Sequence, residues 1–108
     1  MSDLSVEICG LHFTSPLMPS AGPPTRDGAS CVAAVRGGAG AIVSKTISTE
    51  PAQVPRPCIS DVQIGMLNTE LWSELPKEQW IEREYALAKS AGAPLIVGLG
   101  YTAEQIRE

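Results

Sequence analysis

The chain has 108 residues, of which 44% are hydrophobic, and this apolar content suffices for the core of one small domain. Its formal net charge of −4 is spread without runs of like charge, which excludes the basic surfaces that bind nucleic acid or anionic membranes. No apolar stretch approaches the ~20 residues of a membrane-spanning helix, and the N-terminus lacks the features of a signal peptide. We therefore expect a cytoplasmic protein with no membrane span.

Hydrophobic periodicity predicts alternating strands and helices. Apolar residues alternate around Gly10, which indicates a hairpin. Thr25 is a candidate N-cap and Gly37 a stop signal for the first helix, and Pro76 fits the first turn of the second helix. The expected elements are a hairpin over 6–13, a strand over 16–20, a helix over 26–36, a strand over 39–44, a helix over 76–91, a strand over 94–98 and a helix opening at 102.

The connection between the second strand and the second helix is unusually long. It runs from residue 47 to residue 68 and contains Pro51, Pro55 and Pro57. Connections between a strand and the following helix usually have about two to six residues. Loops of this length in compact domains are usually functional, so we expect a functional role for this segment.

The order of these elements predicts an α/β fold. Three strands joined by helical crossovers form a parallel sheet, and such sheets are usually buried on both faces within larger sheets. The predicted fold is therefore the N-terminal portion of a TIM (β/α)8 barrel, with about three βα units plus the N-terminal hairpin. Residues 1–108 would form a partial barrel domain, truncated within the helix that opens at Thr102. Its three strands should be parallel and adjacent in chain order.

Small and polar residues follow each predicted strand of this sheet. Ser20-Ala21-Gly22 follow the first strand, Ser44-Lys45-Thr46 the second and Gly98-Leu99-Gly100 the third. In a parallel barrel the chemistry gathers at this edge. Small residues let a flat ligand come close, and a lysine can hold an anion or stabilise negative charge on a ring. The alternative for Lys45 is an ordinary solvated lysine at a strand end.

Three runs of residues resemble a known flavoprotein family. They are Ser20-Ala21-Gly22-Pro23, Gly40-Ala41-Ile42-Val43-Ser44-Lys45-Thr46 and Leu67-Asn68-Thr69-Glu70-Leu71-Trp72-Ser73-Glu74. In this order and spacing they resemble the N-terminal part of the FMN-dependent dihydroorotate dehydrogenase and dihydropyrimidine dehydrogenase family. The third run resembles the dihydropyrimidine dehydrogenase branch more closely than the dihydroorotate enzymes.

The resemblance implies a role for five residues. It places the backbone of Ala21 and Gly22 against the flavin ring of FMN. Lys45 would approach the pyrimidine edge of the flavin, where its charge favours the reduced anionic form, and Thr46 would hydrogen-bond the cofactor beside it. Asn68 carries both a donor and an acceptor and would bind the amide edge of a pyrimidine-like substrate. The alternative for Asn68 is an Asx turn that leads into the following residues.

By this resemblance the complete protein is an FMN-dependent oxidoreductase of pyrimidine metabolism. It would transfer a hydride between FMN and the CH–CH group of a dihydropyrimidine-like or dihydroorotate-like ring. We expect a homo-oligomer or an electron-transfer partner subunit that carries an iron–sulfur cluster or a flavin. In the family, a cysteine or serine on a later loop moves the substrate proton, so this segment holds no catalytic residue and is expected to be inactive alone. The alternative is a non-enzymatic half-barrel assembly module or a structural subunit of a complex.

The remaining candidates predict no additional site. Cys9, Cys31 and Cys58 are odd in number and lack the paired spacing of zinc or iron–sulfur sites, so we expect free thiols and no metal centre. Glu70 and Glu74 are four residues apart, which predicts that they share one solvated face of a helix.

Overall fold

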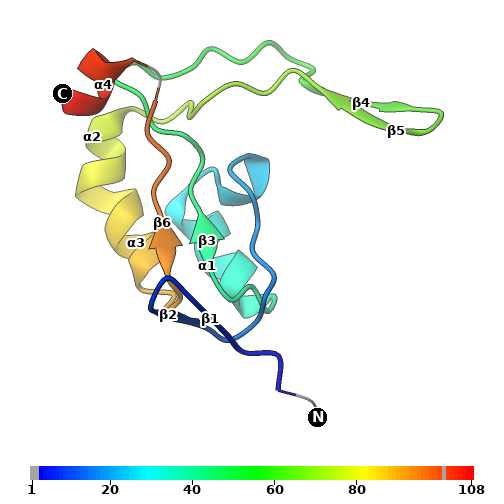
Figure 1. The fold of residues 1–108 in the computed structure, drawn as a ribbon. Helices are drawn as coiled ribbons and strands as arrows, with labels where there is room; N and C mark the ends of the chain where they lie inside the picture. Colours follow the sequence, from blue (N-terminus) through cyan, green and yellow to red (C-terminus); the bar gives the residue numbers. More distant parts are fainter. Residues whose placement is uncertain (1–2, 101) are drawn as a thin grey trace.

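The computed structural model describes residues 3–100 and 102–108, and it consists of short strands and helices joined by long irregular segments (Figure 1). The elements in chain order are β1 (Val6–Ile8), β2 (Leu11–Phe13), η1 (Pro23–Thr25), α1 (Gly28–Arg36), β3 (Ile42–Val43), β4 (Ile59–Val62), β5 (Gly65–Asn68), α2 (Lys77–Gln79), η2 (Trp80–Glu84), α3 (Tyr85–Lys89), β6 (Leu95–Ile96) and α4 (Ala103–Arg107). The elements α2, η2 and α3 follow one another without a break and form one helix, of which η2 is the π-helical middle.

The predicted barrel is wrong. The strands lie in separate two-stranded sheets, β1–β2, β3–β6 and β4–β5, and nothing in the described part of the chain closes into a barrel. The β3–β6 pair is parallel, as predicted for these two segments, but its register covers two residues on each strand, Ile42↔Leu95 and Val43↔Ile96. Each sheet is therefore too small to form a barrel wall, and residues 3–100 and 102–108 do not form the expected partial barrel.

Residues 16–20, predicted as the first strand of the parallel sheet, form no strand. Pro16 and Pro19 have no N–H to donate to a neighbouring strand. The segment meets the sheet region at Gly40, whose N–H donates to the carbonyl oxygen of Leu17 at 2.9 Å. The Leu17 side chain is 73% exposed, whereas a buried strand would enclose it. The segment therefore runs past the β3–β6 pair as irregular chain.

Other predicted elements are confirmed. β1 and β2 pair antiparallel, and Gly10 at their turn has a φ of 75°, a conformation that favours glycine. Gly37 is the C-cap of α1. Thr102 caps α4, and its side chain and that of Gln105 form a reciprocal capping box. Local signals within three or four residues therefore predicted these boundaries correctly.

The start of α1 differs from the prediction. Asp27, not Thr25, is the N-cap, because Asp27 Oδ1 accepts a hydrogen bond from Ser30 N at 2.7 Å. Thr25 lies in the 3-10 turn η1, where it is fully buried and its hydroxyl donates to Gly22 O at 3.4 Å. The helix consequently begins at Gly28, two residues later than predicted.

A second carboxylate reaches the start of α1 from the neighbouring helix. Glu84 is 3% exposed, and its Oε2 accepts a hydrogen bond from Gly28 N at 2.8 Å, while its Oε1 accepts one from Gln79 Nε2 at 2.8 Å. The two helices approach closely, since a Cβ at Gly28 would lie 2.7 Å from Glu84 O and 2.8 Å from Leu87 Cβ. These hydrogen bonds offset the cost of burying the Glu84 carboxylate and fix the helix pair.

The hydrophobic core lies between this helix pair and β3. Its buried centre consists of Cys31, Ile42 and Ala88, against which Val35, Ala91 and Leu95 pack. Burying a side chain as large as that of Ile42 stabilises the fold by about 2–3 kcal/mol. The end of β3 is therefore held in place by the best-packed part of the molecule.

The long connection over 47–68 contains the β4–β5 hairpin, which the sequence did not predict. The two strands pair antiparallel from Ile59↔Asn68 to Val62↔Gly65. Figure 1 shows the hairpin extending away from the helices and from the β3–β6 pair. All residues of both strands are exposed, and Ile64 at the turn is 96% exposed.

Candidate functional site

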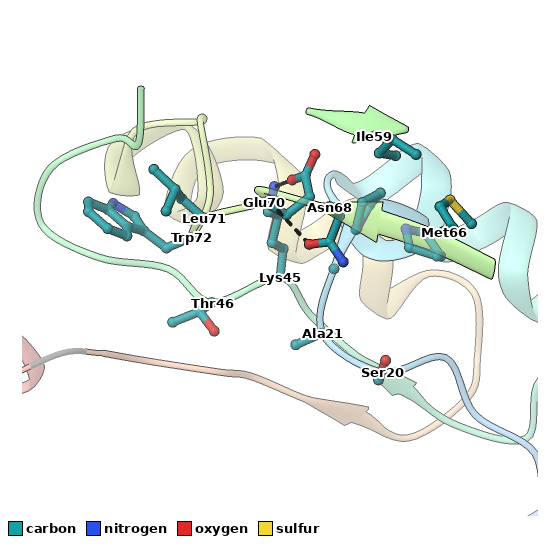
Figure 2. A pocket seen from close by; sticks show the side chains of 13 residues that line it. Ser20, Ala21, Lys45, Thr46, Ile59, Met66, Asn68, Glu70, Leu71 and Trp72 are labelled. Carbon is teal, nitrogen blue, oxygen red and sulfur yellow. Dashed lines mark hydrogen bonds and ion pairs between the residues drawn. The ribbon is translucent and has the colours of Figure 1, made fainter. Parts of the chain in front are cut away.

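A cavity of about 640 Å³ lies where the end of β3, the loop over 20–24 and the β4–β5 hairpin meet (Figure 2). Its lining combines small residues, polar side chains and apolar side chains. The lining residues are Ser20, Ala21, Gly22, Pro23, Pro24, Lys45, Thr46, Ile59, Met66, Asn68, Glu70, Leu71 and Trp72.

The fold brings together all five residues that the resemblance assigned to ligands. Ala21 and Gly22 come from the loop before η1, Lys45 and Thr46 follow β3, and Asn68 ends β5. These segments are distant in sequence, yet each contributes to the lining of the same cavity. Whether the five residues bind FMN and substrate stays a prediction.

The third predicted segment, residues 98–100, is not part of this lining. Gly98 N donates to Ser44 Oγ at 3.1 Å, which joins this segment to the chain that leaves β3. A Cβ at Gly100 would lie 3.2 Å from Thr46 Cγ2, so the glycine leaves room for the threonine. The two glycines therefore lie beside Thr46 and outside the lining of this cavity.

Lys45 is buried and paired. It is 4% exposed, its backbone N–H donates to Thr25 O at 3.1 Å, and its Nζ lies 2.5 Å from Glu70 Oε2. Figure 2 shows the two side chains meeting between the walls of the cavity. A buried ammonium is costly unless a carboxylate compensates for its lost hydration. The alternative of a solvated lysine at a strand end is therefore wrong.

Glu70, the partner of Lys45, was predicted on a solvated helix face, and this prediction is wrong. Residues 69–75 form no helix, and the Glu70 side chain is 13% exposed. Its Oε1 accepts a hydrogen bond from Cys58 Sγ at 3.0 Å and lies 3.7 Å from Arg56 Nη1. The hydrogen bonds from Lys45 and then Cys58, assisted by the charges of Lys45 and Arg56, outweigh the effect of burial and lower the pKa of Glu70.

Arg56 and Glu74 tie the long connection to the segment that precedes α2. Arg56 Nη2 donates to Oε1 and Oε2 of Glu74 at 2.8 Å and 2.7 Å, and Arg56 Nη1 donates to Cys58 Sγ at 2.6 Å. The hydrogen bonds to Cys58 and Glu74 raise the pKa of Arg56. Sequence reasoning missed Arg56 and Cys58, and the length of the connection that contains them was the one signal of their involvement.

Asn68 forms the Asx turn that was the alternative to a substrate contact, and it also lines the cavity. Its Oδ1 accepts a hydrogen bond from Glu70 N at 3.2 Å, so the turn positions the carboxylate that pairs with Lys45. A side-chain amide has two donor hydrogens and two carbonyl lone pairs. The turn uses one lone pair, so the remaining groups of Asn68 are compatible with a ligand contact.

Two apolar walls flank the ion pair. Ile59 and Met66 come from the two strands of the hairpin, and Leu71 and Trp72 lie on the other side of Glu70 (Figure 2). Trp72 Nε1 donates to Glu50 O at 2.7 Å, which fixes the orientation of its indole. Apolar walls of this kind suit the faces of a flat ring.

The lining fits the ring of a flavin or a pyrimidine better than it fits a phosphate. Thr46 and Asn68 offer hydrogen-bonding groups at the edge of such a ring, and the apolar walls offer contacts to its faces. Among the described residues that line the cavity, Lys45 is the one cation, and its ammonium already pairs with Glu70. A phosphate group would therefore meet no uncompensated positive charge in this lining.

No protein-family model matches the chain. Within residues 3–100 and 102–108, no group of three or more His, Cys, Asp or Glu side chains is placed to hold a metal ion. None of the helices in that part of the chain has the length and apolar character needed to cross a membrane.

Proposed function

We propose that this chain forms the ring-binding part of a cytoplasmic FMN-dependent oxidoreductase. The enzyme would resemble the dihydroorotate dehydrogenase and dihydropyrimidine dehydrogenase family and act on the CH–CH group of a dihydropyrimidine-like or dihydroorotate-like ring. One observation carries the proposal. Ala21, Gly22, Lys45, Thr46 and Asn68 were assigned to ligands from sequence, and all five line one cavity.

The local geometry supports a flat ring beside the first loop. A Cβ built at Gly22 would meet Pro24 Cδ at 3.8 Å, an ordinary contact distance, so the backbone there is open to a close approach. Lys45 is held by Glu70, so its side chain loses little conformational freedom when a ligand binds beside it. When bound, FMN would supply the hydride acceptor, and the residues of this chain would orient the two rings.

The proposed function needs two groups that these residues do not supply, one that binds the FMN phosphate and one that acts as a base. A phosphate of FMN would meet no unpaired cation in the described lining, where Lys45 is paired with Glu70, and the reaction needs a base that moves the substrate proton. We assign both to a partner subunit or to further polypeptide, and electron transfer to an iron–sulfur or flavin subunit. The 108-residue chain should then bind FMN weakly and show no turnover.

The test is a titration of the 108-residue chain with FMN, followed by two-dimensional amide NMR. We expect concentration-dependent shift changes at the amides of Ala21, Gly22 and Thr46. Ala21→Leu places a larger side chain in the cavity and should abolish these changes. Ala33→Leu, on an exposed position of α1, is the matched control and should leave them intact. Absence of shift changes up to the solubility limit of FMN would contradict the proposal.

The second candidate function is a non-enzymatic assembly module or structural subunit of a complex, and exposed apolar surface favours it. On the β4–β5 hairpin, Ile64 is 96% exposed, Met66 62% and Leu67 64%. Large exposed apolar surfaces often mark contacts with other proteins. Sedimentation of the chain alone, combined with the FMN titration, separates the two functions. A single stable oligomer that shows no FMN-induced shift would favour the module.

A further inference from the structure

The long helix formed by α2, η2 and α3 leaves an apolar stripe uncovered. Ile81 is 74% exposed, and Tyr85, four residues later, is 45% exposed. Residues four apart lie on the same side of a helix, so the two side chains form one stripe along η2 and the start of α3. Another side of this helix is packed, because Trp80, Glu84 and Ala88 are buried. The stripe therefore lies outside the core.

The stripe is one wall of an apolar groove of about 340 Å³. The other wall comes from the chain that continues β6 and from α4, where Val97 is 38%, Leu99 54% and Ile106 54% exposed. Figure 1 shows β6 and α4 beside the long helix. Large contiguous exposed apolar surfaces usually mark a contact with another protein. Among the described residues, none lines both this groove and the cavity that contains Lys45.

The stripe is acidic at the end where the long helix begins. Lys77 donates a hydrogen bond to Glu108, and both residues line the groove. This hydrogen bond raises the pKa of Lys77 despite the opposing effect of burial, and the charge of Glu108 adds to the increase. The carboxylates of Glu78 and Glu50 also lie near enough to act on the Lys77 charge. Three carboxylates therefore lie around one ammonium, and this end has a net negative charge.

The stripe is basic at the end where the long helix stops. Lys89 is exposed, and its Nζ lies 5.8 Å from the centre of the Tyr85 ring. The cation thus follows the apolar stripe one turn further along the helix. The order along this side of the helix is an acidic end, two large apolar side chains and a basic end.

This order is complementary to a second copy of the same helix that runs in the opposite direction. Ile81 and Tyr85 are centred on position 83, and Glu78 and Lys89 are centred within half a residue of it. One two-fold axis beside position 83 therefore places Ile81 of each copy against Tyr85 of the other. The same axis brings Glu78 of each copy to Lys89 of the other. A copy that ran in the same direction would bring acid to acid and base to base.

We propose that the stripe of Ile81 and Tyr85 and the groove beside it form the interface of an antiparallel homodimer. The charge order selects a second copy of this chain as the occupant. Because each copy contributes one helix and one groove, the interface is small, and we expect a weak and reversible dimer. It should be populated at the concentrations used for NMR and dissociated in dilute optical experiments. The inference goes beyond the proposed function, since the interface forms whether or not the cavity binds a ring.

Sedimentation equilibrium of the 108-residue chain over a range of concentrations tests the dimer. We expect a monomer–dimer equilibrium for the wild type. Ile81→Asp places a charge within the stripe and should weaken the dimer by at least about tenfold. Ile64→Asp, at the exposed turn of the β4–β5 hairpin, is the matched control and should leave the equilibrium unchanged. Circular dichroism should show that both variants stay folded, because both positions are exposed.

Charge reversal tests the antiparallel direction. Glu78→Lys and Lys89→Glu each create two like-charged contacts in a symmetric dimer, so each should weaken the homodimer by about tenfold. An equal mixture of the two variants should regain at least the wild-type association, because every lysine at the interface then meets a glutamate. The double variant should regain it for the same reason. Arg36→Glu, at the exposed end of α1, changes the net charge as Lys89→Glu does and should leave the dimer intact.

Three results would overturn the inference. The first is a wild type that stays monomeric at the highest concentration used for NMR. The second is a dimer that Ile64→Asp dissociates and Ile81→Asp does not, since the hairpin would then be the interface. The third is a mixture of the charge variants that associates no better than either variant alone. The FMN titration is a separate measurement, so a failure of the proposed function is recognised independently of the state of the dimer.

Discussion

The two sides of the cavity are held in different ways. Lys45 and Thr46 continue from β3, whose Ile42 is fully buried in the core. Ile59, Met66 and Asn68 belong to the β4–β5 hairpin, whose residues are exposed along both strands. The first side is supported by apolar packing, whereas the second is joined to the body of the molecule through polar contacts.

This difference predicts that the two sides respond to different conditions. The hairpin side is linked to the rest by the Lys45–Glu70 pair, by the Arg56–Glu74 pair and by the hydrogen bond from Ser73 N to Thr46 O at 2.8 Å. Apolar packing is largely insensitive to pH and to moderate salt, while ion pairs depend on both. Changes in pH and salt should therefore alter the hairpin side first.

The largest expected effect comes from the packed side. Ile42→Ala removes buried methyl groups from the centre of the core and should lower the free energy of unfolding by about 2–5 kcal/mol. Ile64→Ala, at the exposed hairpin turn, is the control and should change it by less than about 0.5 kcal/mol. Urea unfolding followed by circular dichroism measures both. Similar losses of stability in the two variants would mean that apolar packing contributes equally to the two sides of the cavity.

A smaller effect is expected at the junction between the two sides. Lys45→Ala leaves the Glu70 carboxylate without its ammonium and should lower the free energy of unfolding by about 3 kcal/mol. The double variant Lys45→Leu/Glu70→Leu removes both charges and should recover most of this loss, because no charge is left buried without a partner. A double variant as unstable as Lys45→Ala would show that shape, not charge, stabilises the junction.

The dependence of stability on pH should reflect the carboxylates of Glu70 and Asp27. The pKa of Glu70 is lowered from its ordinary value of 4.5 chiefly by its hydrogen bonds. Burial works to raise the pKa of Asp27, but the hydrogen bonds from Ser30 and the charge of Arg26 lower it overall from 3.8. Both groups bind protons more weakly in the folded state, so their contribution is complete above about pH 5 and is lost as the pH falls through the folded-state values.

Thermal unfolding between pH 3 and pH 7 measures this loss. Glu70→Gln should flatten the decrease in melting temperature below pH 5. Glu78→Gln, at an exposed position of α2, is the control and should follow the wild-type curve. If the melting temperature of Glu70→Gln falls as steeply as that of the wild type, groups other than Glu70 cause the loss of stability at acid pH.

The smallest effect is expected from the outer ion pair. Arg56 and Glu74 are 57% and 40% exposed, so Arg56→Gln should lower the melting temperature by only about 1–3 °C. Hydrogen exchange should nevertheless quicken at the amides that pair β4 with β5, while the amides between β3 and β6 keep their protection. Arg36→Gln, at the end of α1, should change neither group. A uniform increase across both sheets would contradict the division of the cavity into two sides.

The sequence predicted those parts of the fold that depend on nearby residues. The helix start at Thr102 and the helix stop at Gly37 depend on contacts within one turn, so their residue types are visible as short patterns. The apolar runs at β3 and β6 also predicted a parallel pair correctly. The run over 16–20 has the same apolar character, but its prolines remove the donors that a strand needs.

The sequence predicted only part of the site, because the rest depends on contacts between distant residues. Lys45 and Asn68 belong to recognisable runs, whereas the Lys45–Glu70 contact joins residues 25 positions apart and leaves no periodic pattern. The spacing of Glu70 and Glu74 even suggested a helix, because a spacing of four residues indicates a shared face only when a helix is present. Exposed strands without a strict alternation of apolar and polar residues likewise concealed the β4–β5 hairpin.

The three thiols lie in three different environments, so the rates at which they are alkylated report when different parts of the molecule open. Cys9 is exposed at the turn between β1 and β2, Cys58 is half-buried beside Glu70, and Cys31 is buried in the core. Burial, and then the charges of Asp27 and Glu84, raise the pKa of Cys31, so its reactive thiolate is rare in the folded state. Iodoacetamide should therefore label Cys9 first, Cys58 at the rate at which the hairpin side detaches, and Cys31 only when the core itself unfolds.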